Sequence, residues 1–439
     1  MLLRPFCFFG SLLISVSTQS ADLISVYEES VRTNPQLAAA AANLGAVRER
    51  RPQAIAGLLP EIGIDGSLSR LRVKNLNQSQ PADRSTNRTA GINLTQPLFR
   101  YDRWIQLKQS DSEIASAEAE YVAAEQELMI QVAERYFQVL DGQDNLKFAE
   151  SEKNSIGRQL DQATQRFEVG LIAITDVKAA QARYDLSASQ EIQAISGLVE
   201  AKESLREVVG TYYDKLAPLK AELELVSPQP ESTDTWVEKA KQQNLSILSA
   251  QATAELARQE ISRQRTGHYP TLDLNASSNY RDTGIGVVPV ERYDNEIGVQ
   301  LNIPVYQGGA VNSRTREARS RFQEATDRLQ QEIRAAEFET RNAYRGVMTD
   351  IAQVRALGKS LESTEVAVEA EEAGFEVGTR TIVDVLNATR ENYLARLNYA
   401  RARYLYVVDQ LRLKRAAGIL SRQDIVEVNG ALDPVKSGP

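Results

Sequence analysis

Apolar positions recur with a helical period in two long stretches of the chain. In residues 98–217 and 305–433 they lie three, four or seven positions apart, and neither stretch contains a proline. This spacing predicts long amphipathic helices with a narrow apolar seam, as in coiled coils. We expect uninterrupted helices over about residues 101–168 and 309–376, each about 100 Å long at ~1.5 Å per residue. Shorter helices are expected over 22–57, 174–210, 233–266 and 381–418.

Between these stretches the apolar residues alternate with polar ones. The clearest case is Ile297, Val299 and Leu301, and similar runs begin near Ile62, Ile92 and Leu272. Alternation predicts four strands with one apolar and one polar face each, joined in pairs by polar loops. Soluble hairpins packed on helices are one explanation of this pattern. Contact with lipid is favoured, because the helices leave no face broad enough to cover the strands.

Four strands in lipid imply an oligomer. An open sheet edge cannot lie in hydrocarbon, since each unpaired backbone group there costs several kcal/mol. Copies of the chain must therefore share one barrel, with eight strands from two chains or twelve from three. An eight-stranded barrel is filled by its own side chains, so only the larger barrel leaves a conduit.

Several motifs occur twice at nearly constant offset. Phe-Glu-Val-Gly occupies residues 167–170 and 375–378, and Asp-Val follows at Asp176 and Asp384, so both pairs are 208 apart (375 − 167 and 384 − 176). A constant offset indicates an internal duplication. We therefore expect repeat 1 at 22–217, a linker at 218–232, repeat 2 at 233–418 and a C-terminal tail at 419–439. A short basic start, an apolar run over residues 5–16 and small polar residues after it predict a signal peptide at 1–21.

Composition excludes most chemistry. The single cysteine, Cys7, lies in the apolar segment of the expected signal peptide, and His268 is the single histidine. Zinc sites need several such ligands and a Ser/His/Asp triad needs a positioned imidazole, so we expect no enzyme, no metal and no cofactor. The formal net charge of −8 also argues against nucleic acid as a partner.

The two turn motifs resemble those of the TolC family of outer-membrane channels. Residues 167–177 and 375–386 carry the resemblance, together with Ile303-Pro304-Val305-Tyr306-Gln307-Gly308-Gly309. It implies an α+β membrane protein, in which a long α-helical coiled-coil barrel continues into a trimeric 12-stranded transmembrane β-barrel with four strands per chain. It further implies a homotrimer in the outer membrane of a Gram-negative bacterium, with a long periplasmic extension.

The resemblance also implies a function. The chain would be the exit duct of a tripartite efflux or type I secretion system, joined by a periplasmic adaptor protein to an inner-membrane transporter. A periplasmic coiled-coil scaffold without a pore is the alternative, although a scaffold needs no matched amphipathic strands. By position, the resemblance assigns adaptor contact to the two turns, at Val169, Gly170, Leu171, Val377, Gly378 and Thr379.

The same resemblance places a gate beside these turns. Asp384 would point into the lumen, where three copies form a carboxylate ring, although interaction with the helix dipole explains an Asp in a first turn equally simply. Arg380 would latch the closed state, with Thr175 and Asp176 as acceptors. Two residues depart from the family pattern: Phe375 lacks a tyrosine hydroxyl, and Asn387 replaces a second lumen carboxylate. Both departures predict a less tightly closed entrance.

Overall fold

The computed structural model describes residues 21–73, 83–284 and 290–433, which form two compact units. Unit 1 consists of Met1–Pro35, Glu125–Trp236 and Glu339–Pro439, and unit 2 of Gln36–Ala124 and Val237–Phe338. The expected signal peptide lies outside the described residues except for Ala21. The predicted division into repeats, linker and tail remains a prediction.

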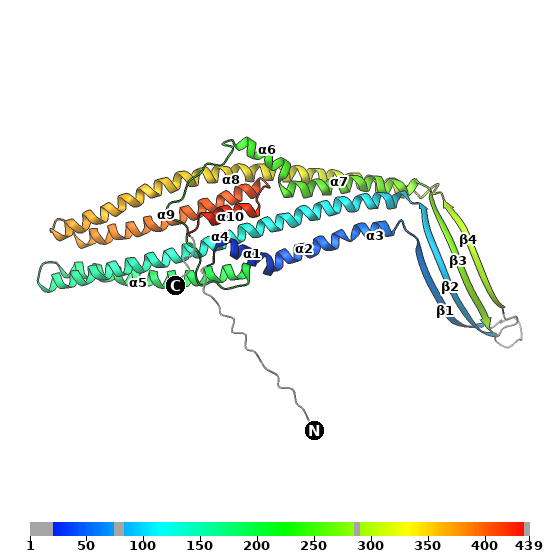
Figure 1. Cartoon of the computed structure of the whole chain (residues 1–439), viewed down its shortest axis with the longest axis horizontal. Helices are drawn as coiled ribbons and strands as arrows, with labels where there is room; N and C mark the ends of the chain where they lie inside the picture. The colour runs from blue at the N-terminus through cyan, green and yellow to red at the C-terminus, as the bar shows by residue number, and fades with distance from the viewer. Residues whose placement is uncertain (1–20, 74–82, 285–289, 434–439) are drawn as a thin grey trace, which may run out of the picture. The chain divides into compact units, whose positions relative to one another are not determined.

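Unit 2 contains one antiparallel sheet with the strand order β1-β2-β3-β4 (Figure 1). The strands are β1 (Glu61–Val73), β2 (Asp83–Phe99), β3 (Thr271–Gly284) and β4 (Val290–Asn302). All four predicted strands are present, and pairing continues into segments expected to be loops. The loops were expected at about residues 74–87 and 282–291, yet Thr86 pairs with Arg70 in the same register that pairs Ile92 with Ile64. Backbone pairing does not require apolar side chains, so hydrophobic alternation underestimates strand length.

The two long helices are continuous. They are α4 (Tyr101–Glu168) and α8 (Ala310–Glu376), within one residue of the predicted ranges. In unit 1, α5 (Ile174–Val209) returns alongside α4 and α9 (Ile382–Ala416) returns alongside α8 (Figure 1). No helix among the described residues is both long and apolar enough to span a membrane.

Two of the four shorter predicted helices, 22–57 and 233–266, are broken at an asparagine, whereas α5 and α9 are continuous. Asn34 separates α1 (Leu23–Thr33) from α2 (Pro35–Arg48), and Asn244 separates α6 (Thr233–Gln243) from α7 (Leu245–Arg265). Asn34 is extended, with ψ of 119°, because the residue before a proline avoids helical geometry. Asn244 Oδ1 accepts hydrogen bonds from the backbone N–H groups of Ser246 (3.0 Å) and Ile247 (3.3 Å), which starts a new helix. The remaining short helices are α3 (Arg50–Ala56), η1 (Thr266–His268) and α10 (Arg422–Gly430).

Helix α10 lies in the expected C-terminal tail and connects it to the start of helix α1. A capping box between Ser421 and Asp424 begins the helix. Asn429 donates a hydrogen bond to Asp22 Oδ2 (3.0 Å) and accepts one from the Ile24 N–H (3.2 Å). This part of the expected tail therefore packs within unit 1.

Candidate functional site

The α4–α5 and α8–α9 turns in unit 1 have the same backbone geometry. Gly170 and Gly378 adopt positive φ angles of 77° and 79°, the left-handed conformation that suits glycine just after a helix. In each turn the residue after this glycine bonds back to the end of the helix: the Leu171 N–H donates to Arg166 O (2.8 Å), and the Thr379 N–H to Gly374 O (2.9 Å). Both turns are Schellman motifs, so the repeated Phe-Glu-Val-Gly sequence produces a repeated structure.

These turns expose large apolar side chains. Val169 is 71% exposed, Leu171 72% and Val377 75%. Thr379 is also exposed, and its hydroxyl donates to Gly374 O (3.1 Å). Apolar groups held on rigid turns without cover provide a surface that another protein can bury.

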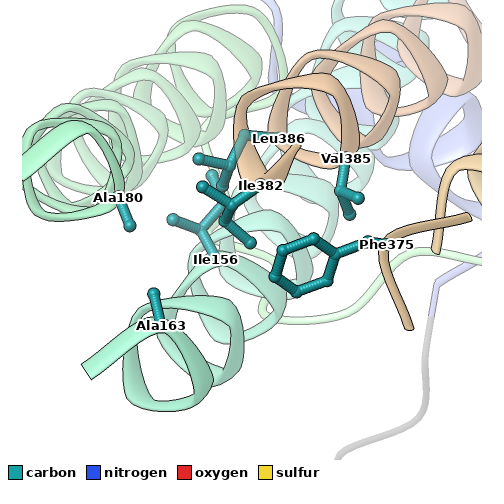
Figure 2. Close-up of a cluster of buried hydrophobic side chains, with 7 residues drawn as sticks. All are labelled: Ile156, Ala163, Ala180, Phe375, Ile382, Val385 and Leu386. Atoms are coloured by element: carbon teal, nitrogen blue, oxygen red, sulfur yellow. The ribbon is translucent and has the colours of Figure 1, made fainter. Parts of the chain in front are cut away.

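A hydrophobic cluster supports the turns from within unit 1 (Figure 2). Figure 2 shows side chains from α4, α5, α9 and the end of α8 converging on one another. Its buried members are Ile156, Ala163, Ala180, Phe375, Ile382, Val385 and Leu386. The guanidinium of Arg166 lies 4.3 Å from the Phe375 ring centre and donates to Phe375 O (3.2 Å). Phe375 thus packs in the core of this cluster, where a hydroxyl would need a partner.

The predicted latch residues lie on the two turns. Arg380 follows the second turn and forms an ion pair with Glu371 of α8 (Nε–Oε2, 3.3 Å). Thr175 is exposed and Asp176 half-buried in the first turn of α5. The Asp176 side chain makes no hydrogen bond or ion pair with any residue that the structure describes. Its link to Arg380 stays a prediction.

Asp384 is held by its own helix. Thr381 is the N-cap of α9, and Asp384 Oδ2 accepts hydrogen bonds from the Thr381 N–H (2.9 Å) and Oγ1 (2.7 Å). These hydrogen bonds from the Thr381 hydroxyl and backbone lower the pKa of Asp384 below its ordinary value. The half-buried Asp384 carboxylate is therefore fixed in position and ionised at neutral pH.

Asn387, one turn further along α9, accepts a hydrogen bond from Arg183 of α5 (Nη2–Oδ1, 3.0 Å). This contact connects helices α5 and α9, which follow the two turns. Sequence reasoning did not single out Arg183, Arg166 or Glu371. Charged residues are frequent on all of these helices, so nothing in the pattern separates the three from solvated neighbours.

The sheet of unit 2 has two faces of opposite character. Neighbouring strands in register place apolar residues on one face, and several are largely exposed, including Ile64 (82%), Ile297 (76%) and Val299 (60%). Hydrogen bonds connect the other face, from Asn275 to Gln300 (3.1 Å) and between Ser67 and Thr89 (2.8 Å). A water-soluble sheet would bury its apolar face, whereas this one leaves it open.

Comparisons with known proteins agree with this architecture. The family described as "Outer membrane efflux protein" matches residues 26–211 and 236–419. The chain is 38% identical over 428 residues to "Outer membrane protein TolC" of Vibrio cholerae, covering 96% of each chain. It is 27% identical over 427 residues to "Alkaline protease secretion protein AprF" of Pseudomonas aeruginosa, covering 95% of this chain and 89% of that one. The Campylobacter jejuni CmeC outer membrane channel has a similar fold, with a TM-score of 0.80 at 18% identity over 99% of this chain and 98% of that one.

Exposed apolar strands, long helices and these relatives together define the class: the protein is an outer-membrane exit duct for efflux or type I secretion. It belongs to the outer membrane efflux protein family. The expected fold class, outer-membrane location and TolC-family resemblance are confirmed. The family consists of transport proteins rather than enzymes.

Proposed function

We propose that the chain works as a homotrimer, in which three four-stranded sheets join edge to edge into a twelve-stranded barrel in the outer membrane. One observation carries the proposal: β1 and β4 each leave one edge unpaired within the described chain, beside an exposed apolar face. Lipid cannot satisfy the open backbone groups, and β4 of one copy can pair with β1 of the next. The apolar face would contact lipid and the polar face would line the lumen.

We further propose that the paired turns form the gated periplasmic entrance. Three copies of the fixed Asp384 carboxylate would make a ring that repels anions and attracts cations, with Asn387 adding no second ring. Arg380 of one copy would close the entrance by contacting Thr175 and Asp176 of its neighbour. The Asp176 carboxylate suits this role, since no described residue of its own chain binds it.

The exposed turns are the proposed docking surface for a periplasmic adaptor, which would connect the duct to an inner-membrane transporter. Val169, Leu171 and Val377 supply apolar area, while Gly170, Gly378 and Thr379 fix the backbone that presents it. A photo-crosslinking amino acid at Val377 should capture the adaptor in cells. The same probe at exposed Ile192, in the body of α5, is the control and should capture less.

The duct is tested by inserting purified protein into a planar lipid bilayer. Discrete, cation-preferring conductance steps are expected. A pore-free periplasmic scaffold, the alternative function, would give no steps and would leave the membrane fraction in high salt. Both results together would refute the proposal.

A further inference from the structure

Two carboxyl groups meet in the packed part of unit 1, outside the proposed entrance. Asp350 of α8 is 5% exposed, and its carboxyl group lies within hydrogen-bonding reach of that of Asp409 on α9. Gly346, one turn before Asp350, leaves space for the Asp409 carboxyl group, because a Cβ at this position would lie 3.2 Å from Asp409 Oδ2. The absence of a side chain at Gly346 thus lets the Asp409 carboxyl group pack against α8.

Among the residues that the structure describes, Arg412 is the one cationic side chain that forms an ion pair with either carboxyl group. Arg412 of α9 binds Asp409 (Nη1–Oδ1, 2.7 Å) and also Glu134 of α4 (Nη2–Oε1, 2.6 Å). Three carboxyl groups from three helices therefore face a single guanidinium. The next arginine along α9, Arg415, is engaged elsewhere, with Glu127 and Glu339.

One oxygen of the pair has no donor. Asp350 Oδ2 is fully enclosed and accepts no hydrogen bond from any residue that the structure describes. A buried carboxylate without a donor is costly, and two adjacent carboxylates repel each other. A proton on one of them removes both problems, because the O–H then donates to the other carboxylate.

We propose that Asp350 and Asp409 hold one proton between them and form a proton-binding site that joins α8 to α9. Loss of this proton to solvent leaves two negative charges beside an arginine already paired with Glu134. Repulsion then loosens the contact between the two helices.

Burial, and then the charge of Asp409, raise the pKa of Asp350 to about 7. A group whose pKa is raised on folding stabilises the fold fully below its unfolded value of about 3.9. That contribution disappears as the pH rises through about 7. The stability of unit 1 should therefore fall as the pH rises from about 4 to about 7 and level off above that, and most of this fall lies where ordinary Asp and Glu side chains are already ionised.

The test is infrared difference spectroscopy of the full chain in detergent, titrated from about pH 5 to about pH 9. We expect a protonated-carboxyl C=O band that disappears with a midpoint near neutral pH. Asp350→Asn should remove the band, and so should Asp409→Asn, whose amide can donate to an ionised Asp350. Glu362→Gln, at an exposed position of α8, is the matched control and should keep it.

Thermal unfolding of the same proteins gives a second readout. The melting temperature of the wild type and Glu362→Gln should fall as the pH rises from about 5 to about 7 and then level off, and that of Asp350→Asn should show no such fall. If a variant fails to fold, the infrared titration of the wild-type protein alone tests the proposal, because its band must disappear near neutral pH. Absence of a titrating band near neutral pH, or its persistence in Asp350→Asn, would overturn the proposal.

Discussion

Arg380 has one observed acceptor and two proposed ones, and they imply different latches for the gate. Within its own chain it binds Glu371 across the α8–α9 turn. In the proposed trimer it would reach Thr175 and Asp176 of a neighbour. The resemblance to the TolC family predicted Thr175 and Asp176 as acceptors, whereas the ion pair with Glu371 is known only from the structure. A contact across a turn follows from backbone geometry rather than from helical spacing, which explains why the sequence pattern did not reveal it.

Replacing Arg380 with alanine should raise single-channel conductance. If three copies of the latch stabilise the closed entrance by about 1 kcal/mol in total, the open fraction should rise about fivefold. Planar-bilayer recordings of Arg380→Ala measure this change. Asp176→Asn should act in the same direction, and Glu371→Gln should have little effect. If Glu371→Gln instead matches Arg380→Ala while Asp176→Asn is silent, the latch lies within one chain.

At the scale of elements, the two returning helices start differently. Helix α9 begins with a complete capping box between Thr381 and Asp384. The N-cap of α5 is Ala173, which is extended but offers no side-chain acceptor, although Asp176 occupies the corresponding third position of the helix. Repetition of the sequence motif predicts the two turns, yet one Thr-to-Ala difference leaves Asp176 without a local partner. Continuous helices 101–168 and 309–376 were predictable because no proline interrupts them, while the break at Asn244 and helix α10 depend on short capping sequences.

Ala173→Thr should complete the missing capping box. We expect it to stabilise the first turn of α5 by about 0.5–2 kcal/mol, since the introduced hydroxyl would accept a hydrogen bond from the Asp176 N–H. Amide hydrogen exchange at Asp176 should slow accordingly. Thr381→Ala is the reciprocal variant and should speed exchange at Asp384. Unchanged exchange in both variants would mean that capping does not govern these turns.

At the scale of the whole molecule, the sheet determines where the protein resides. Alternation along the strands predicted its two faces, and the register aligns them: Ala276 lies between Leu94 and Ile297 on the apolar face. Oligomeric closure was inferred from the cost of open edges in lipid and not from any motif. The gate contacts proposed between copies cannot be derived from contacts within one chain. They are predicted from the resemblance to the TolC family, and the single chain shows only that the residues involved lie on the two turns.

Ile297→Lys should impair membrane assembly. A lysine on the lipid face costs about 2–4 kcal/mol near the bilayer midplane and less toward either surface. Asn275→Lys, on the polar face of the neighbouring strand, is the matched control and should assemble normally. Heat-resistant oligomer on gels of outer-membrane fractions measures the difference. Equal assembly of the two variants would show that the apolar face does not contact lipid.

The most direct measurement is disulfide crosslinking between the free edges of the sheet. The mature chain would contain no native cysteine, so a cysteine at Glu296 of β4 can be combined in turn with one at each of the polar-face positions of β1, Gly63, Asp65, Ser67 and Ser69. In membranes, at least one pair should give covalent dimers and trimers with nothing larger, since three chains close the ring. Monomers from every pair, or a ladder extending beyond three chains, would contradict the shared barrel.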